Sequence, residues 1–156
     1  MAELVAREEV RVSVKFHAFA LQEEDDMEVS APFPEERAEA PGAGFLTVYD
    51  KRLDFQSAGH THEAALTAEV WGSEPSVPDG VRWEAQGEAE IFSTTGNLSI
   101  ETMSGVDEGR VELGRPNTLW KVRAACSGRA EAARLAAVDV PVGVERYLVQ
   151  FWPAGT

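Results

Sequence analysis

Apolar and polar residues alternate with a period of two across residues 10–16, where valine or phenylalanine occupies every even position. This period is typical of a β-strand that buries one face. The alternation then slips, because Phe19 and Leu21 fall on the parity that the polar residues held. We therefore expect either a strand end covered on both faces or a β-bulge at residues 18–21, in a strand that forms one edge of a sandwich.

The chain becomes strongly acidic directly after this strand. Five carboxylates fall within six residues and have no basic neighbour: Glu23, Glu24, Asp25, Asp26 and Glu28. Unpaired charges are costly to bury, so we expect this segment to lie outside the core. The acidic segment continues into a stretch rich in proline, alanine and glycine, and residues 22–44 are predicted to form a loop.

Short stretches with strand character follow at close intervals, separated by turn residues. They cover residues 45–49, 51–57, 62–71, 81–95, 98–102, 110–113, 118–126 and 144–152. Apolar residues occupy both parities of the last stretch, which indicates a central strand. Residues 129–138 are rich in good helix formers and predict one short helix. The fold class that this pattern favours is all-β, an antiparallel sandwich of about eight strands.

A two-residue Gly96-Asn97 loop predicts a β-hairpin, because glycine is suited to the positive φ of a type II′ turn. The register of that hairpin sets Ile91 opposite Thr102. The residues expected on its buried face are Ile91, Leu98 and Ile100.

Length and charge narrow the classes of function. A chain of 156 residues is ordinarily one domain, here 1–156, and is long enough to fold without a metal or disulfide. Its 14 basic and 27 acidic residues give a net charge of −13. Nucleic acid and anionic membranes offer only more negative charge, so both are disfavoured and a basic protein partner is favoured.

The single cysteine, Cys126, permits no disulfide within the chain and is typical of a cytoplasmic protein. The first residues lack the apolar run of a signal peptide, and no uncharged apolar stretch of about 18 residues predicts a membrane span. Cys126 lies on an apolar parity, which indicates a buried and inert thiol.

Candidate chemistry is sparse, and the sequence predicts no catalytic residue and no cofactor. His60 and His62 would point from one face of a strand, as metal ligands on a sheet do, with Glu63 beside them. No further histidine follows them, so a metal site there is the weaker interpretation. A calcium cluster at one end of a sandwich is a second weak interpretation, formed by Asp25, Asp26 and Glu28 together with Asp107 and Glu108. These residues lack the alternating Asp-x-Asp spacing that aims several oxygens at one point.

The order of these segments resembles the DNA-entry nuclease inhibitor family, also called ComJ-like or competence-J proteins. The resemblance rests on VSVKFHAF, RLDFQSAG, ALTAEVW, RWEAQGEAEIFSTTGNLSIET and RVELGRPNTLWKVRAAC, and it spans most of residues 10–152. It implies a bacterial, cytoplasmic, non-enzymatic protein that binds a basic partner, as the founding member binds its nuclease. Two departures are the lack of tryptophan in the acidic linker and the alanine-rich segment 127–143.

The leading hypothesis is therefore an acidic protein-binding module, a nuclease inhibitor or an immunity-like protein, which uses carboxylates to contact a basic protein. The residues assigned to that contact are Glu23, Glu24, Asp25, Asp26 and Glu28. Two alternatives stay open: a small-ligand or metal-binding sandwich that uses His60 and His62, and a structural domain without a catalytic role.

Overall fold

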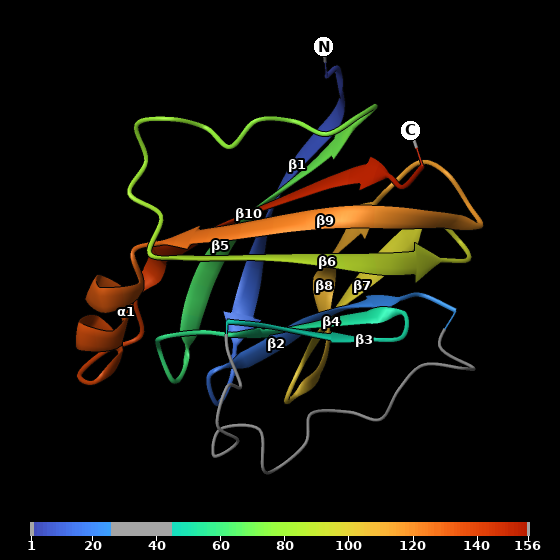
Figure 1. Ribbon diagram of the computed structural model, residues 1–156. Coiled ribbons are helices and arrows are strands. Elements are labelled where there is room, and N and C mark those ends of the chain that lie inside the picture. The colour runs from blue at the N-terminus through green and yellow to red at the C-terminus, as the bar shows by residue number, and fades with distance from the viewer. Residues whose placement is uncertain (1, 26–44, 156) are drawn as a thin grey trace.

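The computed structural model describes residues 2–25 and 45–155, and within these ranges the chain forms two five-stranded sheets and one short helix (Figure 1). The first sheet has the order β1 (Leu4–Val14), β5 (His62–Trp71), β10 (Val142–Pro153), β9 (Thr118–Ser127) and β6 (Ala85–Ser93). The second has the order β3 (Leu46–Tyr49), β4 (Arg52–Gln56), β2 (Ala18–Glu23), β7 (Asn97–Thr102) and β8 (Gly105–Glu112). Helix α1 (Arg129–Ala136) connects β9 to β10.

This arrangement confirms the predicted sandwich and its short helix, with ten strands in the described ranges where about eight were expected. The pairing is antiparallel except between β5 and β10, which run parallel. Strand β10 lies between β5 and β9 in the middle of its sheet, which explains why its sequence is apolar on both parities. Strand β1 forms an edge of the first sheet, as expected.

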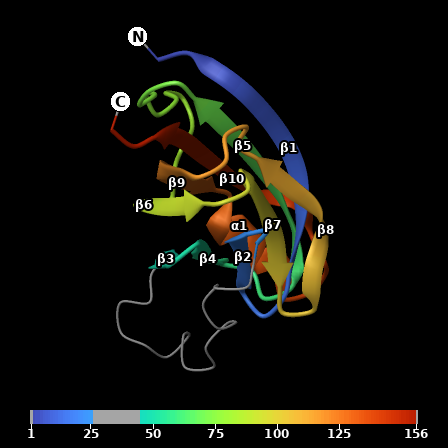
Figure 2. The same cartoon turned by 90° about the vertical axis from the view of Figure 1, so that its right-hand side faces the viewer.

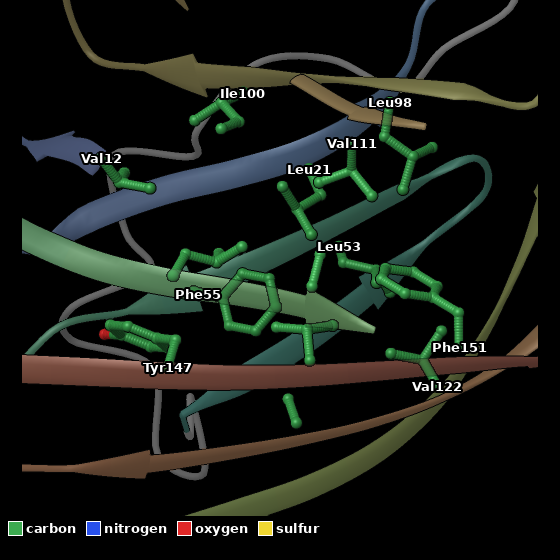
Figure 3. Close-up of a cluster of buried hydrophobic side chains, with 14 of the residues drawn as sticks. Val12, Leu21, Leu53, Phe55, Leu98, Ile100, Val111, Val122, Tyr147 and Phe151 are labelled. Atoms are coloured by element: carbon green, nitrogen blue, oxygen red, sulfur yellow. The ribbon is translucent and has the colours of Figure 1, made fainter. Parts of the chain in front are cut away.

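The core lies between the two sheets, whose inward side chains meet in one layer (Figure 3). Its centre is aromatic: the rings of Phe19 and Phe55 stack at 4.9 Å, and Tyr147 meets Phe19 edge-on at 5.0 Å. Each fully buried ring of this kind contributes about 1.5–3 kcal/mol by leaving water. Ile91, Leu98 and Ile100 are all buried, as expected from the sequence.

The phase slip near residue 18 marks a change of sheet. Strand β1 ends at Val14 in the first sheet, and β2 begins at Ala18 in the second. The predicted bulge is therefore wrong, whereas the alternative of a segment covered on both faces is confirmed, since all six residues of β2 are buried. The apolar residues move to the other parity because β1 and β2 lie on opposite sides of the core, so each strand turns a different set of alternate side chains toward it.

The predicted hairpin at Gly96 is wrong for the same reason. Strand β6 pairs with β9 in the first sheet, and β7 pairs with β2 and β8 in the second, so Ile91 and Thr102 are not partners. Gly96 does have the expected positive φ, 83°. A Cβ there would lie 2.8 Å from the carbonyl oxygen of Arg115, so the crossing needs glycine for space as well.

A buried carboxylate, Glu145, holds the loop between β4 and β5, and this loop is bonded to the turn between β1 and β2. The chain passes from one sheet to the other at both places. The Glu145 side chain on β10 is 0% exposed and accepts hydrogen bonds from Ser57 Oγ at 2.6 Å, the Ala58 amide at 2.9 Å and Tyr147 Oη at 2.7 Å. Ser57 and Ala58 belong to the loop between β4 and β5. The backbone of Ser57 in turn donates to the carbonyl of His17, in the turn between β1 and β2.

His62 completes this arrangement, which we call the Glu145 cluster: Ser57, His62, Glu145 and Tyr147. The only hydroxyl proton of Ser57 goes to Glu145, so the contact of 2.8 Å from His62 Nε2 to Ser57 Oγ is donated by the imidazole. The guanidinium of Arg129 lies 3.8 Å from the Glu145 carboxylate and supplies a countercharge. Burial, together with the Glu145 carboxylate, raises the pKa of Tyr147 well above its usual value, so its hydroxyl remains a donor.

Replacing this carboxylate is expected to destabilise the fold. Glu145→Gln keeps the size of the side chain but turns an amide donor toward groups that also donate. Leaving such buried donors unpaired costs about 1–3 kcal/mol, and urea unfolding should show that loss. Glu9→Gln on the exposed face of β1 should stay within about 0.5 kcal/mol of the parent, and equal stability of the two variants would contradict the role of Glu145.

The pH dependence of stability should identify His62. Burial lowers its pKa below the ordinary value of 6.5, and nearby His17 lowers it further, while the Glu145 carboxylate only partly opposes the shift. The unfolded chain then binds a proton that the folded protein does not, so stability is full above pH 6.5 and falls as the pH decreases toward the folded-state pKa. One such proton changes the unfolding free energy by at most about 1.4 kcal/mol per pH unit.

Urea unfolding between pH 5 and pH 7 measures this slope. We expect a shallower slope for His62→Gln than for the parent protein. An unchanged slope in His62→Gln would assign the acid sensitivity to other groups.

Candidate partner-binding surface

Glu23, the first of the predicted contact residues, is not on the surface. Its side chain is 0% exposed, and its carboxylate accepts hydrogen bonds from Ser93 Oγ at 2.6 Å and Thr95 Oγ1 at 3.1 Å. Burial alone raises the pKa of Glu23, but hydrogen bonds from Ser93, the Asp25 amide and Thr95 outweigh it and lower the pKa. The expectation that the whole acidic segment lies outside the core is thus wrong for Glu23, because buried donors replace the water that this carboxylate loses.

Glu24 and Asp25 are exposed, as predicted. The Glu24 carboxylate lies 3.3 Å from the Arg110 guanidinium of β8, which places it beside the last strand of the second sheet. Asp26 and Glu28 lie outside the described residues, as does the rest of the predicted loop to residue 44.

Strands β1 and β8 are edges of different sheets that lie next to each other (Figure 2). A shift in the pairing of β7 with β8 leaves Asp107, Glu108 and Gly109 opposite a single residue of β7. The Asp107 carboxylate accepts a hydrogen bond from the backbone amide of Ser13 at 2.8 Å, so a side chain satisfies a donor on the edge of β1. Irregular, charged edges of this kind prevent the exposed edge of a sheet from pairing with further strands.

Two adjoining hollows follow this seam, and together we call them the β8 groove. The larger, of about 620 Å³, lies between β1 and β8, and the smaller, of about 260 Å³, continues toward β7; both include Asp107, Glu108 and Gly109. Among the described residues, five carboxylates and two guanidinium groups line the groove, and these seven side chains sum to a charge of −3. These side chains are Glu24, Glu63, Glu101, Asp107 and Glu108, with Arg11 and Arg110.

Like charges are crowded at the rim of the groove. Partial burial and repulsion by Glu112 raise the pKa of Glu8, and attraction to Arg110 opposes that rise only in part. Arg110 itself pairs with both Glu24 and Glu112, at 3.3 and 3.2 Å. A cationic group placed at this rim would relieve the repulsion between Glu8 and Glu112.

The predicted histidine site does not assemble. His60 is exposed and its imidazole meets that of His17 edge-on at 5.1 Å, whereas His62 is buried in the Glu145 cluster. Glu63 points elsewhere, to the Arg11 guanidinium on the neighbouring strand β1 at 3.5 Å. Within residues 2–25 and 45–155, no three histidine, cysteine or carboxylate side chains are grouped so that they could hold a metal ion.

Cys126 is buried, as predicted, and burial raises the pKa of its thiol to about 12. The thiolate, which is the reactive form, is therefore scarce at neutral pH.

A further hollow, of about 620 Å³, borders β6 and β9 and is lined by the carboxylates of Glu74, Glu88 and Glu90 together with Lys121. Trp152 contributes to its wall but is almost entirely buried, and the Arg123 guanidinium lies over its ring at 5.2 Å. This tryptophan thus offers no open ring face on which a sugar or base could stack.

The structure places Asp107 and Glu108 in one hollow with Glu24. The sequence pattern groups these two residues with Asp25, Asp26 and Glu28 instead, and only as a calcium cluster that their spacing disfavours. It missed Glu63 and Glu101, which a period-of-two pattern marks only as polar positions on separate strands. Their convergence depends on which edges of the two sheets meet, and no local pattern encodes that.

The helix among the described residues is too short to cross a membrane. No protein-family model matches the chain, and no curated protein sequence does so either.

Solved structures do match it over nearly its whole length. ComJ of Bacillus subtilis, the inhibitor of the DNA-degrading activity of NucA, has a TM-score of 0.62 and 16% sequence identity, covering 99% of both chains. The crocagin biosynthetic gene J product has a TM-score of 0.66 and 13% identity, covering 96% of this chain and 99% of its own. The chain therefore has the fold of ComJ, as the resemblance in its sequence predicted.

Proposed function

We propose that this protein is a non-enzymatic inhibitor that binds a basic DNA-degrading nuclease through the β8 groove. The observation that carries the proposal is an exposed groove of net charge −3 on a protein with the fold of a nuclease inhibitor. A cytoplasmic location, which the lone cysteine favours, forms part of the same proposal.

The electrostatics support such an encounter. A nuclease must attract the phosphates of DNA, so its substrate cleft carries positive potential. The carboxylates of the β8 groove present a row of negative charges between two strands. In a complex, these carboxylates would occupy the positions in the nuclease cleft that DNA phosphates otherwise take. The net charge of −13 adds long-range attraction and raises the rate of association, an effect that salt weakens.

An arrangement among the described residues that resembles a catalytic pair, Ser57 with His62, argues for a structural role. Ser57 Oγ lies 2.8 Å from His62 Nε2, but both side chains are buried and the serine proton is donated to Glu145. A nucleophilic serine would need an open path to substrate and a base ready to accept its proton. This pair offers neither, which supports binding rather than catalysis.

The similarity to a biosynthetic protein shows that the fold serves more than one role. Inhibition of a nuclease is favoured here because the groove is open, charged and lined by side chains from β1, β5, β7 and β8, whereas the buried polar groups hold the sheets together.

Neutralising the groove should weaken inhibition. A triple variant Glu24→Gln, Glu101→Gln, Glu108→Gln removes three negative charges and leaves the bond from Asp107 to Ser13 in place. We expect at least about a tenfold rise in the inhibition constant, since exposed charge pairs contribute up to about 1 kcal/mol each. The measurement is DNA degradation by a panel of basic nucleases that includes NucA, repeated at low and high salt.

The matched control is Glu74→Gln, Glu88→Gln, Glu90→Gln, which removes the same charge from the hollow beside β6. It should inhibit nearly as well as the parent. If both triple variants lose inhibition equally, net charge and not the groove is responsible, and if the parent slows none of the nucleases, the proposed function fails.

A further inference from the structure

The turn between β1 and β2 has an unusual backbone. Lys15 and Ala18 pair across it, and both central residues are left-handed, with φ of 53° at Phe16 and 63° at His17. Tight turns of this type favour Asn-Gly or Gly-Gly, since side chains with a Cβ are strained at positive φ. A phenylalanine in this conformation is an outlier, and residues held in this way cluster at functional sites.

Phe16 is also largely exposed to solvent. Its side chain is 61% exposed, although burying a phenylalanine is worth about 1.5–3 kcal/mol. The turn therefore combines two unfavourable features, a strained backbone and an aromatic ring exposed to water. Neither contributes to the stability of the isolated protein.

The exposed ring is nevertheless held in place. Phe16 meets the His60 imidazole edge-on at 5.0 Å, and His60 meets His17 at 5.1 Å. His17 is fixed in turn, because its amide donates to the carbonyl of His60 at 2.9 Å and its Nδ1 lies 3.1 Å from the carbonyl oxygen of Ser57. We call Phe16, His17 and His60 the Phe16 tip, a preorganised group that loses little freedom on binding.

The Phe16 tip lies at one end of the β8 groove. Ser13, three residues before Phe16, lines the groove and is bonded to Asp107. The hairpin of β7 and β8 ends on the same side, since Phe19 of β2 pairs with Thr102, and its residues Met103 and Val106 are exposed. Apolar side chains thus border the acidic groove, and protein interfaces characteristically combine an apolar centre with a charged rim.

We propose that Phe16 is the anchor of the partner interface and inserts into an apolar pocket on the basic protein that covers the β8 groove. This inference rests on the proposed function and adds the contact that determines affinity. Rigid aromatic side chains in desolvated pockets supply most of the binding energy at protein interfaces, while rim charges mainly set the rate and specificity of association.

The strain makes this assignment testable, because fold and binding should respond in opposite directions. Asparagine tolerates the left-handed conformation, so Phe16→Asn is expected to raise the melting temperature, by about 2–4 °C if it relieves the strain of one residue. The same change removes the anchor and should raise the inhibition constant against the most sensitive nuclease of the panel by at least about tenfold.

Two further variants separate the anchor from general effects of apolar loss. Phe16→Tyr retains the ring and should inhibit within about threefold of the parent, since hydrophobic pockets tolerate an added hydroxyl better than loss of the ring. Val138→Asn removes an apolar side chain that is 84% exposed beyond α1 and should leave inhibition unchanged.

The outcomes distinguish this inference from the proposed function. Weaker inhibition by Phe16→Asn together with full inhibition by Val138→Asn supports the anchor. If the parent inhibits and the groove triple variant is impaired, but Phe16→Asn inhibits like the parent, the anchor is overturned and the groove remains. If the parent inhibits no nuclease of the panel, both are overturned.

Discussion

The fold depends on a carboxylate that is buried without loss of its hydrogen bonds. Glu145 joins the central strand of one sheet to the loop that leads out of the other, and that loop is bonded to the turn between β1 and β2. An acidic group buried in this position is tolerable because a hydroxyl, an amide and a phenol donate to it and a guanidinium lies nearby. The two crossings therefore hold a fixed geometry at this end of the sandwich.

That geometry has consequences on the surface. Fixing the two crossings sets where β1 ends, and hence where its edge meets the irregular edge of β8. The β8 groove lies where these two edges meet. The Phe16 tip is connected to the Glu145 cluster by the contact between His17 Nδ1 and the carbonyl oxygen of Ser57. A polar core that is inert in itself thus positions the exposed groups to which we assign binding.

Glu23 and Glu24 show how neighbouring acids acquire different roles. Both belong to one acidic run, yet Glu23 is enclosed by Ser93 and Thr95, whereas Glu24 faces solvent beside Arg110. The hydroxyl donors that make burial of Glu23 possible are about 70 residues away in the chain. Charge in the sequence therefore predicts the electrostatic character of a surface, but not which carboxylate belongs to it.

The sequence by itself determined the strand content, the short helix, the burial of Ile91, Leu98 and Ile100 and the central position of the last strand, because these follow from periodicity over neighbouring residues. It also determined the acidic character that favours a basic partner. Only the tertiary structure decided that the chain changes sheet after Val14 and at Gly96, since an alternating pattern records that a side chain points inward but not into which sheet its strand is built. The β8 groove was decided at the same level, because it arises where strands distant in sequence meet. The left-handed turn at Phe16 was decided there too, because it lies where the chain passes from the first sheet to the second.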